Sequence, residues 1–263
     1  MHFTKMHGLG NDYLYVYGEP ENPEERSRIL SDRHFGVGSD GMVWIAPSEI
    51  ADFQMRIFNA DGSEAKMCGN GIRCVGKYVY DKGYTEKTHL TIETLSGIRT
   101  LELSVEGGRV VRVSVDMGQV AAEPERSLIA GGQPVSGIPV SVGNPHFVCF
   151  VEDGETAPLT TLGPLLEKHE AFPGGVNVEF VQVLSPTELR MRVWERGSGV
   201  TMACGTGACA SVGAAVSQGF CPAGVPIQVH LDGGTLEIVL DADGRAVMTG
   251  PAATICEGET ELC

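Results

Sequence analysis

The motif Cys-Gly-x-Gly occurs twice, in MCGNGIRC (67–74) and in ACGTGACA (203–210). Each copy leads into a segment that is apolar on nearly every side, IRCVGKYVYDKG after the first and ACASVGAAVSQG after the second. A helix with so little polar surface is typical of a buried position. We therefore expect each motif to begin a central helix that strands surround.

The sequence around the two motifs is similar over a longer range, which indicates an internal duplication. With the cysteines matched, FNADGSEAKMCGNGIRC (58–74) aligns with VWERGSGVTMACGTGACA (193–210). Earlier in each half, GLGNDY (8–13) matches SVGNPHF (141–147). The same landmarks in the same order predict two pseudo-symmetric halves.

Most of the remaining sequence alternates as strands do. The segments LTIETLSGIRTLELSVEGGRVVRVSVDMG (90–118) and IQVHLDGGTLEIVLDADGRAVMTG (227–250) have period-2 apolar runs that Ser-Gly, Gly-Gly and Asp-Gly pairs interrupt, as in hairpins. Helices are few, and one of them is expected to start with Asn22 as the N-cap before Pro23.

The predicted fold class is mixed α/β and strand-rich, with two pseudo-symmetric domains, each a strand barrel around a central helix. We expect one domain over 1–116, which carries Cys68, and one over 117–263, which carries Cys204. We also allow for the last few residues packing back on the first domain.

Charge and composition exclude several classes of protein. The 263 residues include 19 basic and 34 acidic side chains, so the formal net charge of −15 should repel nucleic acid and anionic membranes. The segment MHFTKMHGLG has no charged region followed by an apolar run, and no eighteen consecutive residues are apolar, so we expect neither a secretion signal nor a membrane span. We expect a cytoplasmic protein with no nucleic-acid or membrane partner, and its eight cysteines as reduced thiols.

The motifs predict neither a metal nor a cofactor. The cysteine spacings contain no CxxC, and no HExxH is present, so a zinc site is not expected. GVGSDG (36–41) matches the dinucleotide pattern GxGxxG, but a helix-like segment precedes it and a strand-like segment follows, the reverse of the required order. We interpret it as a structural turn.

The start of a helix beside a cysteine suits acid–base chemistry. Backbone N–H groups there bind carboxylates and favour a thiolate. If the two thiols face one cavity, ionising one hinders ionisation of the other, which leaves a general base opposite a general acid. Donors from Gly69, Asn70, Gly205 and Thr206 would stabilise charge on a substrate carboxylate as the Cα proton leaves. The pattern predicts a racemase or epimerase, although a single cysteine is more often a small buried hydrophobe.

The chain resembles the diaminopimelate epimerase family in five segments, which occur in order over nearly its whole length: MHFTKMHGLGNDY, FNADGSEAKMCGNGIRC, GNPHFV, GVNVEFV and RVWERGSGVTMACGTGACA. Proline racemase-like enzymes share the two-cysteine plan but typically carry His where Asn70 stands, and they lack NADGSE and ERGSG in this form. The resemblance implies a homodimeric isomerase, independent of pyridoxal phosphate and other cofactors. Its expected reaction interconverts LL- and meso-diaminopimelate for lysine and peptidoglycan synthesis.

The resemblance also implies roles for particular residues. Cys68 and Cys204 would be the acid–base pair, and His146 and Glu195 would tune their pKa values. The substrate contacts it implies are Asn11, Asn59, Gly69, Asn70, Asn144, Asn177, Glu195, Arg196, Gly205 and Thr206.

Elementary chemistry fits these roles, with one departure from the family. Arg196 offers a bidentate partner to a distal carboxylate, and the asparagines offer donors and acceptors to a zwitterion. Without the resemblance, turn chemistry would account for the asparagines and a solvated surface position for Arg196. Some family members place a substrate-contacting Gln at the position of Gly41, a contact that this chain must lose or replace.

Two alternatives stay open. A proline or hydroxyproline racemase-like enzyme would need no partner for a distal carboxylate. A non-catalytic amino-acid-binding protein on the same scaffold would need Arg196 but not both thiols.

Overall fold

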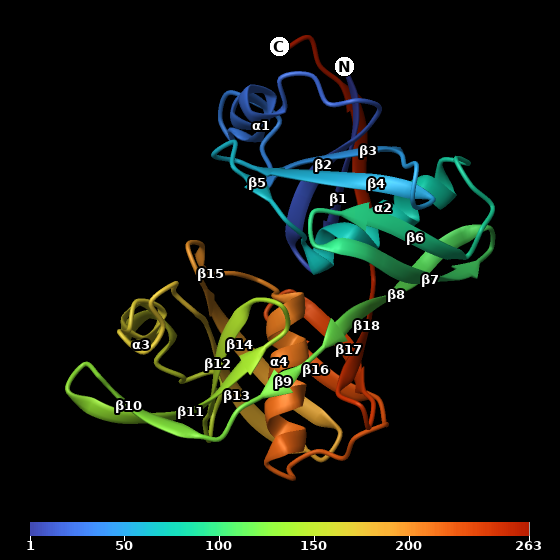
Figure 1. Ribbon diagram of the computed structural model, residues 1–263. Coiled ribbons are helices and arrows are strands. Elements are labelled where there is room, and N and C mark those ends of the chain that lie inside the picture. The colour runs from blue at the N-terminus through green and yellow to red at the C-terminus, as the bar shows by residue number, and fades with distance from the viewer. Residues whose placement is uncertain (263) are drawn as a thin grey trace. The chain divides into compact units, whose positions relative to one another are not determined.

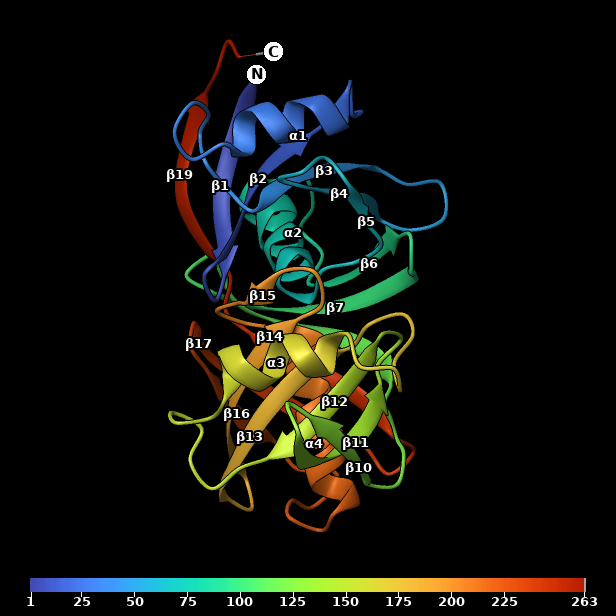
Figure 2. The same ribbon diagram turned by 90° about the vertical axis from the view of Figure 1, so that its left-hand side faces the viewer.

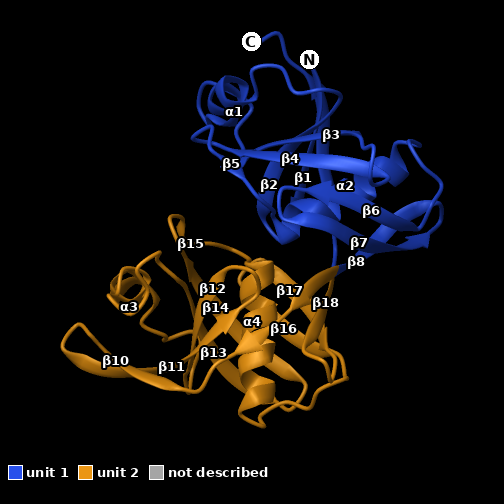
Figure 3. Ribbon diagram, in the orientation of Figure 1, with its two compact units in different colours: residues 1–115, 250–263 blue, residues 116–249 orange. Residues whose placement is uncertain are grey.

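The computed structural model describes residues 1–262 and divides the chain into two compact units, shown in Figure 3. Unit 1 comprises residues 1–115 together with 250–263, and unit 2 comprises residues 116–249. Nineteen strands and four helices occur in the described residues. The prediction of a mixed, strand-rich α/β fold is therefore confirmed.

Unit 1 is built from most of the first half of the chain and its last strand (Figure 1). Its elements are β1 (His2–Gly8), β2 (Asn11–Tyr17), α1 (Pro23–Ser31), β3 (Gly41–Pro47), β4 (Phe53–Asn59), β5 (Glu64–Ala65), α2 (Gly69–Asp81), β6 (His89–Thr94), β7 (Gly97–Glu106), β8 (Arg109–Gln119), which continues past the boundary, and β19 (Ala253–Glu259). Strand β19 pairs antiparallel with β1.

Unit 2 repeats this plan. Its elements are β9 (Ala121–Ala122), β10 (Arg126–Ala130), β11 (Gln133–Ser141), β12 (Pro145–Phe150), α3 (Leu159–Glu167), β13 (Asn177–Ser185), β14 (Glu188–Glu195), β15 (Gly199–Val200), α4 (Gly205–Ser217), β16 (Ile227–Leu231), β17 (Gly234–Leu240) and β18 (Arg245–Gly250).

The parallel pairs of strands correspond between the two units. In unit 1, β2 pairs parallel with β3 across α1, and β4 pairs parallel with β6 across α2. In unit 2, β12 pairs parallel with β13 across α3, and β14 pairs parallel with β16 across α4. Antiparallel hairpins join β3 to β4 and β6 to β7 in unit 1, and β13 to β14 and β16 to β17 in unit 2. Equivalent crossovers in equivalent positions are what a duplicated sequence should produce.

Helices α2 and α4 occupy the interior of their own units, as Figures 1 and 2 show. Nearly every residue of both helices is buried. Their glycines allow side chains of β7 and of the segment between β8 and β9 to approach closely. A Cβ on Gly76 would lie 2.9 Å from the methyl groups of Leu101 and Leu103, and a Cβ on Gly213 would lie 2.5 Å from Val120. Both central helices predicted from the apolar segments are therefore present.

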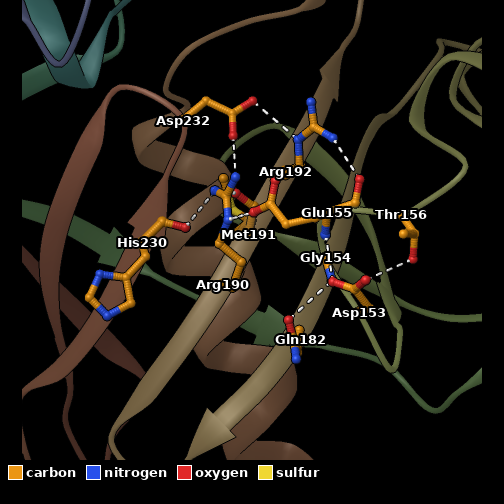
Figure 4. Close-up of polar contacts among 10 residues, drawn as sticks. All are labelled: Asp153, Gly154, Glu155, Thr156, Gln182, Arg190, Met191, Arg192, His230 and Asp232. Carbon is orange, nitrogen blue, oxygen red and sulfur yellow. Dashed lines mark hydrogen bonds and ion pairs between the residues drawn. The ribbon is translucent and has the colours of Figure 1, made fainter.

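An ion-pair cluster fixes the start of β14 (Figure 4). Arg190 donates from Nε to Glu155 Oε1 at 2.7 Å and also pairs with Asp232, while Arg192 Nε lies 3.2 Å from Asp232 Oδ2. Gly154 N donates to Gln182 Oε1 at 3.1 Å. These contacts tie the loop after β12 to β13 and β14, and the β16–β17 turn to β14, the strand that ends at Glu195.

Candidate functional site

Each motif cysteine caps the N-terminus of a central helix with its own sulfur. Cys68 Sγ accepts a hydrogen bond from Gly71 N at 3.3 Å, and Cys204 Sγ accepts one from Gly207 N, also at 3.3 Å. Both cysteines have extended backbone angles, as N-cap residues do. A donor aimed at the sulfur from the positive end of a helix suits a reactive thiol in each unit.

In unit 1, Cys68 belongs to a short chain of hydrogen bonds. Its thiol donates to Asn11 Oδ1 at 3.3 Å, and Asn11 Nδ2 donates to Asp40 Oδ2 at 2.8 Å. Arg33 Nη2 donates to Asp40 Oδ1 at 2.8 Å. Asn11, a substrate contact implied by the resemblance, therefore lies beside Cys68, whereas Arg33 and Asp40 were not predicted.

The other unit 1 residues named from the sequence have different surroundings. Asn59 Nδ2 donates to Ser63 Oγ at 3.0 Å within the β4–β5 turn. Gly69 and Asn70 are buried in the first turn of α2, directly after Cys68.

The backbone at Gly41 accounts for the missing glutamine. A Cβ there would lie 2.2 Å from the carbonyl oxygen of Phe58 and 2.9 Å from the ring of Tyr13, so no side chain fits this backbone. Tyr13 and Asn11 share one face of β2, since they are two residues apart. Burial raises the pKa of the Tyr13 phenol well above its ordinary value, and the charge of a Cys68 thiolate would raise it further. A neutral phenol therefore occupies the space near Cys68 that Gly41 leaves.

In unit 2, a longer chain of contacts ends at Cys204. Cys204 Sγ lies 3.5 Å from Thr206 Oγ1, and Asn144 Nδ2 donates to Thr206 Oγ1 at 3.3 Å. Asn144 Oδ1 lies 3.0 Å from His146 Nε2, and His146 Nδ1 lies 2.6 Å from Glu179 Oε1. The structure brings together four residues predicted from the sequence and adds Glu179, which sequence analysis missed.

Glu179 is a carboxylate in the core. Its side chain and that of His146 are both 0% exposed, and its Oε2 has no hydrogen-bond partner in residues 1–262. A Cβ on Gly207 would lie 2.8 Å from Glu179 Oε1, so the carboxylate lies against the first turn of α4. In the sequence, the feature that could have indicated this buried carboxylate is the single acidic residue in the apolar strand segment VNVEFV.

Two carboxylates shift the protonation of Cys204. Burial raises the pKa of this thiol well above its ordinary value, and the charges of Glu195 and Glu179 raise it further. Burial likewise raises the pKa of Glu195, although a hydrogen bond from Thr201 opposes that shift. Unit 2 therefore favours the thiol form of Cys204.

Arg196 and Asn177 lie together at the end of β14. Asn177 Oδ1 accepts from Arg196 N at 2.9 Å, and Asn177 Nδ2 donates to Pro145 O at 3.1 Å. The Arg196 guanidinium donates to Gly174 O at 3.0 Å and is exposed. Asn177 thus holds the backbone that carries Arg196.

Within residues 1–262, no group of three or more His, Cys, Asp or Glu side chains is arranged to hold a metal ion. None of the helices in this range is long and apolar enough to cross a membrane. The cysteines in the same range form no disulfide bond with one another.

Comparison with known proteins gives consistent matches. The sequence profile for diaminopimelate epimerase matches residues 3–122 and 138–255. The diaminopimelate epimerase of Methanococcus maripaludis strain C6 is 51% identical over 100% of both chains. That of Bacillus licheniformis is 51% identical over 98% of this chain and 97% of its own.

Solved structures show the same fold at low sequence identity. A PhzF-family phenazine biosynthesis protein from Bacillus anthracis matches with a TM-score of 0.78 at 17% identity, covering 100% of this chain and 99% of that one. A probable proline racemase from Agrobacterium radiobacter K84 matches with a TM-score of 0.77 at 20% identity, covering 100% and 93%. At this identity the likeness concerns the fold alone.

Proposed function

Since the chain belongs to the diaminopimelate epimerase family, we propose that it is an isomerase that interconverts LL- and meso-diaminopimelate by proton transfer at one Cα. The observation that carries the proposal is the pair of helix-capping cysteines, Cys68 and Cys204, at equivalent positions of two units with corresponding parallel strand pairs. The expected product serves lysine and peptidoglycan synthesis.

The proposed reaction needs only proton transfers. One cysteine, as the thiolate, takes the proton from Cα, and the electron pair of the C–H bond moves into the substrate carboxylate. The other cysteine, as the thiol, delivers its proton to the opposite face of the same carbon. The first sulfur is then a thiol and the second a thiolate, so the reverse reaction uses the same pair with exchanged roles. This chemistry calls for no cofactor and no metal.

Backbone donors are proposed to hold the charge that develops on the carboxylate. The N–H groups of Gly71 and Gly207 donate to the two sulfurs. The preceding N–H groups of each helix, from Gly69, Asn70, Gly205 and Thr206, are the proposed donors to the carboxylate. Preorganised donors of this kind typically contribute about 2.7–4 kcal/mol each to the transition state.

Arg196 is the proposed partner of the distal carboxylate. Its exposed guanidinium and the Asn177 hydrogen bond to its backbone support this role. Asn11, Asn59, Asn144 and Glu195 are proposed to contact the rest of the zwitterion, while His146 and Glu195 tune the thiols. We also propose a cytoplasmic homodimer, on the strength of the family resemblance alone.

A substrate panel tests the proposal. LL-diaminopimelate, lysine, proline and hydroxyproline are each incubated with the protein, and stereoisomers are separated by chiral chromatography. Only diaminopimelate should be epimerised. Turnover of proline or hydroxyproline would instead support a proline racemase-like enzyme, and binding without turnover would support a non-catalytic protein.

Replacing Arg196 tests how the substrate is selected. Arg196→Met should lower kcat/KM for diaminopimelate by a factor that corresponds to about 2–5 kcal/mol of lost transition-state stabilisation. This is the cost of truncating a buried charge pair formed with substrate. Arg192→Met is a suitable control because that side chain pairs with Asp232 in the ion-pair cluster. Equal losses in both variants would show that Arg196 contributes only to the fold of unit 2.

A further inference from the structure

Both oxygens of Asp40 accept hydrogen bonds. Oδ2 accepts from Asn11 Nδ2 at 2.8 Å and from Asp12 N at 3.1 Å, and Oδ1 accepts from Arg33 Nη2 at 2.8 Å. A backbone N–H and a guanidinium can only donate, so both oxygens face donors. The amide group of Asn11 must therefore point its nitrogen at Asp40.

This orientation fixes what Cys68 meets. With the Asn11 nitrogen at Asp40, the Asn11 oxygen lies 3.3 Å from Cys68 Sγ. An amide oxygen accepts but cannot donate, so the contact is a hydrogen bond only while the sulfur carries its proton. The N–H of Gly71, in contrast, can donate to the sulfur in either protonation state. The Asn11 contact is thus selective for the thiol.

A cluster of alternating charges holds Asp40 in place. Arg33 Nη2 also donates to Asp12 Oδ1 at 3.0 Å, and Lys5 Nζ lies 3.0 Å from Asp12 Oδ2. The two cations and two carboxylates balance each other. The side chains of Lys5 and Asp12 are only 17% and 11% exposed, so this end of the cluster is shielded from solvent.

Three other titratable groups that interact with Cys68 in unit 1 are neutral at physiological pH. They are the phenols of Tyr13 and Tyr15 and the thiol of Cys74. Burial raises the pKa of each of them, to about 11 for Cys74. None of them carries a positive charge that would compensate a thiolate, and the Tyr13 phenol, which hydrogen-bonds Cys68, can donate to the sulfur in either protonation state.

We propose that Asp40 is a positioning residue, which orients the Asn11 oxygen toward Cys68 and so keeps this cysteine protonated in the absence of substrate. The inference rests on the proposed catalytic role of Cys68. It adds an explanation of how the reactivity of this thiol is kept low before substrate binds. A thiol is far less prone than a thiolate to oxidation and alkylation. When a substrate ammonium group donates to Asn11 Oδ1 in place of the thiol, the sulfur loses this hydrogen bond and its proton can leave to solvent.

The test is the pH dependence of Cys68 alkylation by iodoacetamide in the substrate-free protein. Peptide mass spectrometry resolves Cys68 from the other cysteines. In Asp40→Ala, the Asn11 amide is free to turn its nitrogen to the sulfur and stabilise the thiolate. The midpoint should move to lower pH, and alkylation below the midpoint should rise about two- to tenfold, the effect of one modest hydrogen bond.

Asp52→Ala is the matched control. Like Asp40, Asp52 accepts three hydrogen bonds, from the Lys87 ammonium group and from the backbone N–H and the hydroxyl of Thr91. Asp40→Asn, which keeps one acceptor oxygen, serves as a milder variant and should shift the midpoint less.

The outcomes separate the inference from simpler explanations. The inference is overturned if the midpoint of Cys68 alkylation in both Asp40 variants equals the midpoint in wild type and in Asp52→Ala. A rise by the same factor at every pH also overturns it, because that is the result of a loosened loop. Alkylation is measured without turnover, so a failure of the proposed epimerase activity would leave this result unaffected. An active enzyme with an unshifted midpoint would reject only the role of Asp40.

Discussion

Asn11 and Asn144 occupy matched positions in the duplicated sequence, yet different side chains orient them. Asn11 is bound directly by the carboxylate of Asp40, whereas Asn144 meets the imidazole of His146, which pairs with Glu179. Asn11 contacts its cysteine directly, and Asn144 does so through Thr206. The two halves therefore surround chemically identical thiols with different partners.

The role of each thiol can be tested by removing it. Cys68→Ala and Cys204→Ala should each abolish epimerisation, since the reaction needs an acid and a base on opposite faces of Cα. Alanine removes little buried volume, so circular dichroism and the free energy of unfolding should stay close to wild type. Cys256→Ala, at an exposed position outside both motifs, is the control. Near-normal turnover in either motif variant would contradict the acid–base assignment.

The buried carboxylate of Glu179 should affect the ionisation of Cys204. Its charge raises the pKa of that thiol, so Glu179→Gln should lower the pH at which half of Cys204 is alkylated. Glu188→Gln, at an exposed position of β14, should leave that pH unchanged. An unshifted midpoint in Glu179→Gln would mean that Glu179 serves only to orient His146.

At the residue scale, the sequence predicted those features that local chemistry determines. Cysteines before glycine turns cap helices because the chain alone sets that geometry, and Asn11 was recognised from its motif. Asp40 and Glu179 were missed because their partners come from distant parts of the sequence. The space at Gly41 also depends on a distant residue, since the carbonyl of Phe58 on the neighbouring strand excludes a side chain there.

At the scale of elements, too, the sequence predicted features that depend on local residues and missed those that depend on distant ones. The central helices and the hairpin turns near residues 96, 108, 232 and 243 follow from the periodicity, and the structure contains them. Helix α1 begins at Pro23 as predicted, but Asn22 adopts a left-handed backbone with φ of 45° and its side chain makes no capping hydrogen bond. The parallel pairs across the helices were not predicted, because long-range packing selects them.

Glu167 illustrates how one helix end supports the turn that carries Arg196. Its carboxylate accepts from Trp194 Nε1 at 2.7 Å and from Gly197 N at 2.9 Å. The hydrogen bond from Trp194 is the main cause of a lowered pKa for Glu167. The ionised form is therefore the one that stabilises the fold.

This linkage gives a pH-dependent stability difference. Glu167→Gln should lower the free energy of unfolding by about 1–2 kcal/mol at pH 7, since one charge-assisted hydrogen bond becomes neutral and the other loses its acceptor oxygen. A lowered pKa contributes stability above the ordinary glutamate value, and that stability is lost as pH falls through the folded-state pKa. The gap between wild type and variant should therefore narrow below pH about 4.3. Urea denaturation from pH 7 to pH 3 measures this difference in the free energy of unfolding. The control is Glu170→Gln, at an exposed position. A difference that stays constant with pH would show that the charge of Glu167 is unimportant.

At the scale of the whole molecule, the duplication was visible in the sequence because the motifs recur in order. The shared crossovers across α1, α2, α3 and α4 show how far the two copies agree in structure. What the sequence could not indicate was the asymmetry of the polar contacts around the two thiols, because that arises from single residues that differ between the copies.

The two-base mechanism makes a prediction about hydrogen exchange. In D₂O, the cysteine that delivers a proton has equilibrated with solvent, while the other holds the proton it removed. Product isolated at low conversion should carry deuterium at Cα in nearly every molecule, and unreacted substrate should keep protium. Mass spectrometry of the separated isomers measures this. Substantial protium in the product would indicate a single base that serves both faces.

The pairing of β19 with β1 has a consequence for the order of events during synthesis. Met1 N donates to Thr260 O at 2.6 Å, so the first and last described segments of the chain complete one unit. Unit 2 is continuous over residues 116–249 and leaves the ribosome before residues 250–263 do. Although domains usually fold from the N-terminus as they emerge, here the unit that begins first is completed last. A chain truncated after residue 249 would contain the second unit whole but leave β1 with an unpaired edge, the kind of edge that promotes aggregation.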